Sequence, residues 1–155
     1  LRVFDVHDLW THDVEDLMKL HKPAVVVFDM IDNIKFSGAA ANNGQRTDQL
    51  LEEMYKWARN LAVKFDCAAL ATSQVSNDGD GMQYPTLGML KDSKTGKQGA
   101  ADAIITLGSV NDPMLATSRY IGLTKNKKNR TGGPQSPMQE LIIDGSRGRY
   151  LETPT

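Results

Sequence analysis

Cysteine is nearly absent from this chain of 155 residues, and long apolar runs are absent altogether. The single cysteine, Cys67, excludes a disulfide within the chain and suits a reducing compartment. No run of about 18 apolar residues occurs, which excludes a transmembrane helix of the usual kind. The first residues do not combine a basic segment with an apolar one, so they do not resemble a secretory signal. These features predict a cytoplasmic protein without a membrane partner.

Net charge is also small, at −1, but it is unevenly distributed. Residues 91–130 contain eight Lys and Arg against three Asp, a local balance of +5. A basic stretch of this kind can contact the phosphates of a nucleotide or a nucleic acid. It can equally be the solvated face of a loop, and charge does not decide between the two.

The length suits one domain, and we expect residues 1–155 to form a single one. Hydrophobic content of 40% and charged content of 24% are ordinary for a globular protein. Apolar residues at spacings of three and four predict helices over residues 11–22, with Thr11 as N-cap, and over 46–66. Runs rich in β-branched and apolar residues predict strands at 1–6, 24–30, 67–73 and 101–108.

The alternation of strands and helices predicts an α/β fold with a mostly parallel sheet. The near-continuous apolar run of residues 24–30 is typical of a parallel strand that is covered on both faces. The last strands, at 117–130, 138–144 and 148–152, are joined by Gly-rich turns. We expect them to form antiparallel hairpins at one edge of the sheet.

Two polar residues stand at the ends of predicted parallel strands. Asp29 ends the strand in "AVVVFDMIDN", and Gln74 ends the strand in "CAALATSQ". Ligands of open α/β sheets bind beyond the carboxyl ends of the strands, so both side chains are candidates for one site. Asp29 resembles a Walker B carboxylate, an oxygen ligand that suits Mg²⁺, and the amide of Gln74 can both donate and accept hydrogen bonds. The alternative is that both simply mark strands that have reached the surface.

The basic segment "LTKNKKNRTGG" at residues 123–133 ends in glycines. An Arg that reaches a phosphoryl group under transfer stabilises the transition state, and a neighbouring subunit can supply it. The alternative is a basic hairpin edge that discourages strand aggregation.

In chain order, the segments "VVVFDMID", "ALATSQ", "LKDSKTGKQGAADAIITL" and "LTKNKKNRTGG" resemble the RecA-like motor domain of DnaB-type replicative helicases, particularly of phage primase-helicases. The resemblance covers nearly the whole chain and implies a RecA-like P-loop NTPase core that uses ATP and Mg²⁺. It also implies single-stranded DNA as partner and a homo-oligomeric ring, expected to be a hexamer. The compartment it implies is the cytoplasm of a bacterium or of a phage-infected cell.

The resemblance also implies roles for individual residues. Asp29 would support Mg²⁺ through water, Gln74 would sense the γ-phosphate, and Gln98 would lie on the nucleotide side. Lys128 and Arg130 would be the cations that act on the ATP of a neighbouring subunit, with Lys125 and Lys127 as the other possible register. The DNA-contacting loop would supply three lysines to DNA phosphates: Lys91, Lys94 and Lys97.

One departure from the family is large, because a Walker A loop is missing. The one Gly-Lys pair, Gly96-Lys97, is followed by Gln98 where Ser or Thr is needed. In the family this loop and the Glu that polarises water lie upstream. We therefore expect the chain to be the C-terminal part of a motor domain that, by itself, binds ATP poorly and hydrolyses none.

Two other readings stay open. One is a related RecA-type ATPase, such as a recombinase, which shares the same core physics. The other is a non-catalytic domain that binds nucleic acid or a protein on a degenerate ATPase fold. A zinc site is not indicated, because Cys67 and the three histidines lack ligand spacing. Asp32 is a candidate to assist Asp29 or to solvate a turn.

Overall fold

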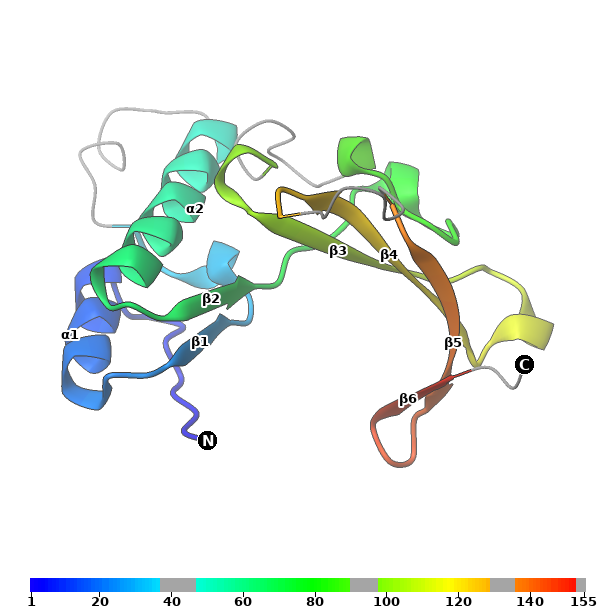
Figure 1. The fold of residues 1–155 in the computed structure, drawn as a ribbon, viewed down its shortest axis with the longest axis horizontal. Helices are drawn as coiled ribbons and strands as arrows, with labels where there is room; N and C mark the ends of the chain where they lie inside the picture. Colours follow the sequence, from blue (N-terminus) through cyan, green and yellow to red (C-terminus); the bar gives the residue numbers. More distant parts are fainter. Residues whose placement is uncertain (37–46, 90–97, 129–135, 153–155) are drawn as a thin grey trace. The chain divides into compact units, whose positions relative to one another are not determined.

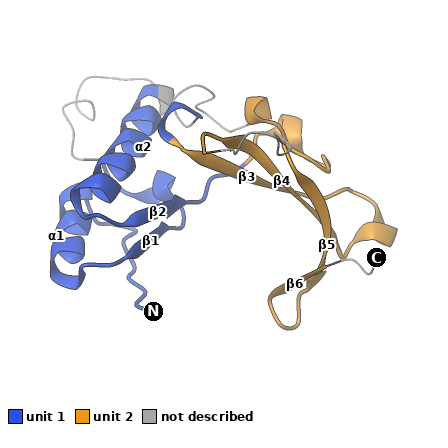
Figure 2. Ribbon diagram, in the orientation of Figure 1, with its two compact units in different colours: residues 1–74, 95–100 blue, residues 75–94, 101–155 orange. Residues whose placement is uncertain are grey.

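The structure is a computed structural model that describes residues 1–36, 47–89, 98–128 and 136–152. Within these ranges the chain forms two compact units, shown in different colours in Figure 2. Unit 1 comprises residues 1–74 and 95–100, and unit 2 comprises residues 75–94 and 101–155.

Unit 1 contains the helices and the parallel strands of the first half of the chain (Figure 1). Their order is α1 (Thr11–His21), β1 (Val25–Phe28), the 3₁₀ turn η1 (Ile31–Asn33), α2 (Thr47–Lys64) and β2 (Ala68–Ala71). β1 and β2 pair in parallel, from Val25 opposite Ala68 to Phe28 opposite Ala71. A parallel pair needs a long crossover connection, and α2 lies within it. The two helices and two strands predicted for this region are confirmed.

The core of unit 1 lies between one face of this sheet and the two helices. Ile31 is fully buried, and Met54 and Leu61 of α2 are each 2% exposed. The full buried cluster is Val14, Met18, Phe28, Ile31, Ile34, Leu51, Met54, Ala58 and Leu61. The apolar spacing of both helices thus marks the faces that pack, as the 3.6-residue period requires.

The other face of the β1–β2 sheet is not covered by the described residues. Val25, Val27 and Leu70 are 54%, 60% and 53% exposed, although β-branched and apolar residues dominate both strands. Successive residues of a strand point to opposite faces, so Val26 and Phe28 enter the core while Val25 and Val27 do not. The expectation that β1 is covered on both faces is wrong for the part of the chain that is described.

The start of the chain also differs from the prediction. Residues 1–6 form no strand, and most of their side chains are exposed. The N-cap of α1 is Trp10 rather than Thr11, because the Asp13 carboxylate accepts the Trp10 N–H at 2.8 Å. The Thr11 N–H donates to the Lys35 carbonyl at 2.9 Å, and Thr11 becomes the buried first residue of the helix.

Unit 2 is built on an antiparallel sheet with the order β3-β4-β5-β6. Its strands are β3 (Ala103–Gly108), β4 (Ser118–Asn126), β5 (Met138–Asp144) and β6 (Arg149–Glu152), and short 3₁₀ turns lie at η3 (Asn77–Gly79), η4 (Leu87–Met89) and η5 (Pro113–Leu115). The antiparallel C-terminal strands are confirmed. β3 was expected in the parallel sheet, but it pairs with β4 in antiparallel register. A short connection suffices for an antiparallel pair, so β3 pairs with the next strand along the chain, and the described sheets are less parallel than the sequence predicts.

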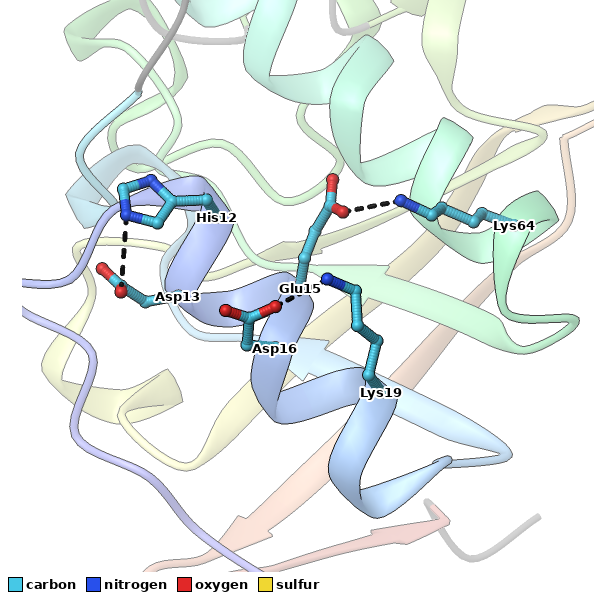
Figure 3. A network of polar contacts seen from close by, with 6 residues as sticks. All are labelled: His12, Asp13, Glu15, Asp16, Lys19 and Lys64. Atoms are coloured by element: carbon cyan, nitrogen blue, oxygen red, sulfur yellow. Dashed lines mark hydrogen bonds and ion pairs between the residues drawn. The ribbon is translucent and has the colours of Figure 1, made fainter.

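The outer surface of α1 carries a group of ion pairs (Figure 3). Lys64 of α2 contacts Glu15 at 2.7 Å, and Lys19 contacts Asp16 at 2.6 Å within α1. The hydrogen bond with Lys19 and the charge of its ammonium lower the pKa of Asp16. These side chains are largely exposed, and exposed ion pairs add little to stability. The Glu15–Lys64 contact does join the two helices, which suits a role in packing.

Across the described ranges, none of the helices combines the length and the apolar character needed to cross a bilayer.

Candidate functional site

The carboxyl end of the parallel β1–β2 pair gathers polar side chains from both strands. Asp29 directly follows the buried Phe28, and its side chain is exposed. The peptide bond between Asp29 and Met30 is cis. A rigid, buried strand thus presents a carboxylate at the edge of the sheet where ligands of such folds bind.

Thr72 holds this carboxylate from the neighbouring strand. The Thr72 hydroxyl donates to Asp29 Oδ1 at 2.6 Å, and the Thr72 N–H donates to the Phe28 carbonyl at 3.0 Å. The second bond continues the ladder beyond the last paired residues, Phe28 and Ala71. An O–H···O⁻ bond of this length is short and charge-assisted. The ends of the two strands are therefore linked through both backbone and side chains.

Gln74 lies two residues beyond Thr72, and its side chain is exposed. β2 ends at Ala71, so Gln74 is on the segment that leaves the strand rather than at its tip. Within the described residues no hydrogen bond joins Gln74 to Asp29. The structure brings the two predicted residues to the same end of adjacent strands, and their roles stay predictions.

A second polar group lies behind this edge, around Tyr55 of α2. Burial raises the pKa of Tyr55 to about 12, a hydrogen bond with Ser73 opposes the rise, and Asp32 adds to it through its charge and a hydrogen bond. A phenol that stays neutral can donate a hydrogen bond to a carboxylate. Asp32, which the sequence left open between a site role and a turn role, therefore neighbours Tyr55.

Gln98 belongs to unit 1 and is half-buried. Arg59 of α2 donates to the Ala100 carbonyl at 2.6 Å, which fixes the backbone two residues after Gln98 against the helix. The contribution of Gln98 to nucleotide binding stays a prediction.

The cationic candidates on unit 2 differ in how free they are. Lys127 donates its N–H to the Asp102 carbonyl at 2.8 Å, and its ammonium lies 3.7 Å from the Asp102 carboxylate. Lys128 is exposed, and only its backbone N–H makes a hydrogen bond to the described residues, to Asn126 at 3.0 Å. A cation that acts on another subunit must be exposed and free to reach it. This difference favours the register that contains Lys128 over the one that contains Lys127.

Comparison with known proteins gives structural relatives only. No family model matches the chain, and no curated protein matches it. Two solved structures match with a TM-score of 0.70 at 16% sequence identity, each over 92% of this chain. One is the ATPase domain of a DnaB-like helicase, and the other is a DnaB-like replicative helicase studied together with its interactions with primase.

The chain has the fold of a DnaB-like helicase ATPase domain. It spans 50% of the first matched chain and 34% of the second, so much of each relative has no counterpart in it. The expected RecA-like architecture is supported at the level of fold. At this sequence identity, activity and partners do not follow from the likeness.

Four of the predicted residues of this DnaB-like fold lie outside the described residues. They are the three lysines expected to contact DNA and the Arg of the trans-acting pair, namely Lys91, Lys94, Lys97 and Arg130. Their roles stay predictions.

The donor set at the sheet edge was tested for a metal. No group of three His, Cys, Asp or Glu side chains that could hold a metal ion occurs among the described residues. An exposed carboxylate beside a hydroxyl does suit Mg²⁺, which favours oxygen ligands and is often bound through one or two carboxylates, waters and substrate phosphates. The residues present therefore fit a shared Mg²⁺–nucleotide site better than a metal site built by protein alone.

Sequence reasoning missed Thr72, Ser73 and Tyr55. A usable signal for Thr72 existed, because "VVVFD" and "AALAT" align strand against strand in parallel, which places Asp29 beside Thr72. No comparable signal existed for Tyr55, whose neighbours depend on how α2 packs.

Proposed function

We propose that this chain is part of the motor domain of an ATP-dependent replicative DNA helicase. One observation carries the proposal: within a DnaB-like ATPase fold, Asp29 and the segment that bears Gln74 leave adjacent parallel strands at the same edge. The two units would then belong to one domain, the compartment would be the cytoplasm of a bacterium or phage-infected cell, and the complete protein would form a ring on single-stranded DNA.

In this proposal the residues divide the work of phosphoryl transfer. Asp29 would hold Mg²⁺ through a water molecule, and Gln74 would form a hydrogen bond that depends on the γ-phosphate. Bound Mg²⁺ supplies positive charge that neutralises the phosphates and orients them. Lys128 and Arg130 of a neighbouring subunit would stabilise charge on the transferred phosphoryl group.

The DNA side rests on charge. Lys91, Lys94 and Lys97 would contact backbone phosphates in the channel of the ring. Binding of this kind is tolerant of sequence and weakens as salt rises, because condensed counterions are released.

The test uses the complete protein encoded by the reading frame and measures DNA-stimulated ATP hydrolysis. Asp29→Asn is expected to lower turnover by about a hundredfold or more, the scale of losing one electrostatic contact to the transition state. Asp66→Asn is the matched control. Asp66 precedes β2 at the opposite edge of the sheet, and its φ of 49° is one that Asn tolerates.

A second arm replaces Arg130 by Ala in the intact oligomer. Most turnover should be lost while nucleotide binding remains, because the Arg acts on transferring phosphate rather than on nucleotide capture. Turnover that survives Asp29→Asn at the level of the Asp66→Asn control overturns the nucleotide site.

The same protein separates the other two readings. Strand exchange without unwinding of a forked duplex would identify a recombinase-type ATPase. A reading frame that lacks an upstream Gly-Lys-Thr/Ser segment would favour a non-catalytic binding domain.

A further inference from the structure

Thr72 is the described residue whose side chain touches the proposed metal carboxylate. Its hydroxyl has two acceptors within reach, Asp29 Oδ1 at 2.6 Å and the Phe28 carbonyl at 3.5 Å. The first distance is that of a strong charge-assisted bond, and the second lies at the limit of a hydrogen bond. The hydroxyl is therefore directed at the carboxylate.

The backbone makes this contact rigid. The Thr72 N–H bond to the Phe28 carbonyl sets the position of Thr72 against the residue just before Asp29. Thr is β-branched, so its χ1 angle is restricted on a strand-like backbone. The donor is thus placed by the sheet itself rather than by a mobile loop.

The contact leaves the carboxylate half-used. Asp29 Oδ1 accepts the Thr72 hydroxyl, and no described donor reaches Oδ2. A carboxylate anchored through one oxygen loses rotational freedom and presents the other oxygen in one direction. Partners of metal-binding carboxylates that act in this way commonly change metal affinity about tenfold to a hundredfold when they are removed.

We propose that Thr72 is a positioning residue that orients Asp29 toward Mg²⁺, an inference that rests on the proposed nucleotide site. Thr72 does not touch the metal or the nucleotide. It acts through Asp29, so its effect should vanish when Asp29 can no longer hold the metal.

The test measures metal binding directly in the complete protein with ADP present. Mn²⁺ serves as the probe, and its free concentration is followed by electron paramagnetic resonance. Thr72→Val removes the hydroxyl at nearly constant shape and should weaken Mn²⁺ binding about tenfold or more. Thr72→Ser keeps the hydroxyl and should restore affinity to within about threefold of the original, since a second-shell contact of this kind is then retained.

Two controls separate positioning from a general structural role. Thr124→Val deletes a hydroxyl that donates to the Ile104 carbonyl at 3.2 Å in unit 2, and it should leave Mn²⁺ affinity unchanged. In an Asp29→Asn background, Thr72→Val should cause no further loss, because coupled residues are not additive. Circular dichroism checks that each variant folds.

The outcomes are distinguishable. If Asp29→Asn weakens Mn²⁺ binding while Thr72→Val does not, Thr72 is not a positioning residue and the nucleotide site stands. If Thr72→Val causes the same loss with and without Asp29, its role is structural and the inference fails. If Asp29→Asn itself leaves Mn²⁺ binding intact, the proposed site fails first.

Discussion

Truncation of Leu61 tests the core that holds the sheet edge in place. Leu61 lies in α2 with 2% of its surface exposed, within the buried cluster of unit 1. Leu61→Ala removes three carbon atoms, about 2.4 kcal/mol at about 0.8 kcal/mol for each buried carbon. The cavity left behind adds to this, so the free energy of unfolding should fall by about 2 to 5 kcal/mol. Val63→Ala is the control, because Val63 is on the same helix and 77% exposed.

The assay is urea denaturation followed by tryptophan fluorescence. Both tryptophans of the chain, Trp10 and Trp57, lie in unit 1, so the signal reports this unit. With a slope of about 2 kcal/mol per molar urea, Leu61→Ala should lower the midpoint by at least about 1 M. Val63→Ala should change stability by less than about 0.5 kcal/mol. A loss below about 1 kcal/mol for Leu61→Ala, or equal losses in the two variants, would refute this account of the core.

Two further predictions concern packing and pH. A Cβ on Gly108 would lie 2.7 Å from the Gln83 carbonyl carbon, so Gly108→Ala should lower stability by about 1 to 3 kcal/mol in thermal melts followed by circular dichroism, whereas Gly145→Ala, with nothing within 4 Å, should not. Because the fold raises the pKa of Tyr55 to about 12, its stabilising effect is complete below the ordinary value of 10 and is lost as pH rises through 12. Unfolding monitored at pH 9 and pH 12 should show this loss in the original protein and a smaller one in Tyr55→Phe; equal losses would contradict it.

The local elements of unit 1 could be predicted because their signals are local. Apolar spacing placed α2 and its buried face, and the run "AVVVF" placed β1 with Asp29 at its end. The shared edge for Asp29 and Gln74 followed from one rule about parallel strands. These inferences needed no knowledge of distant contacts.

The errors arose where a non-local partner decides the outcome. β3 has the composition of a parallel strand, yet its neighbour β4 pairs with it antiparallel. The Asp13 carboxylate, three residues away, moved the cap of α1 from Thr11 to Trp10. Thr72 was overlooked because its importance comes from a carboxylate on another strand.

The bare side of the β1–β2 sheet has a consequence for anyone who handles this polypeptide. Val25, Val27 and Leu70 give unit 1 an oily side, and oily surfaces of this kind tend to adhere to one another. In dilute solution water stands between such surfaces, and in concentrated solution another molecule takes its place. Each preparation therefore has a crowding limit, set by three side chains that take no part in nucleotide chemistry.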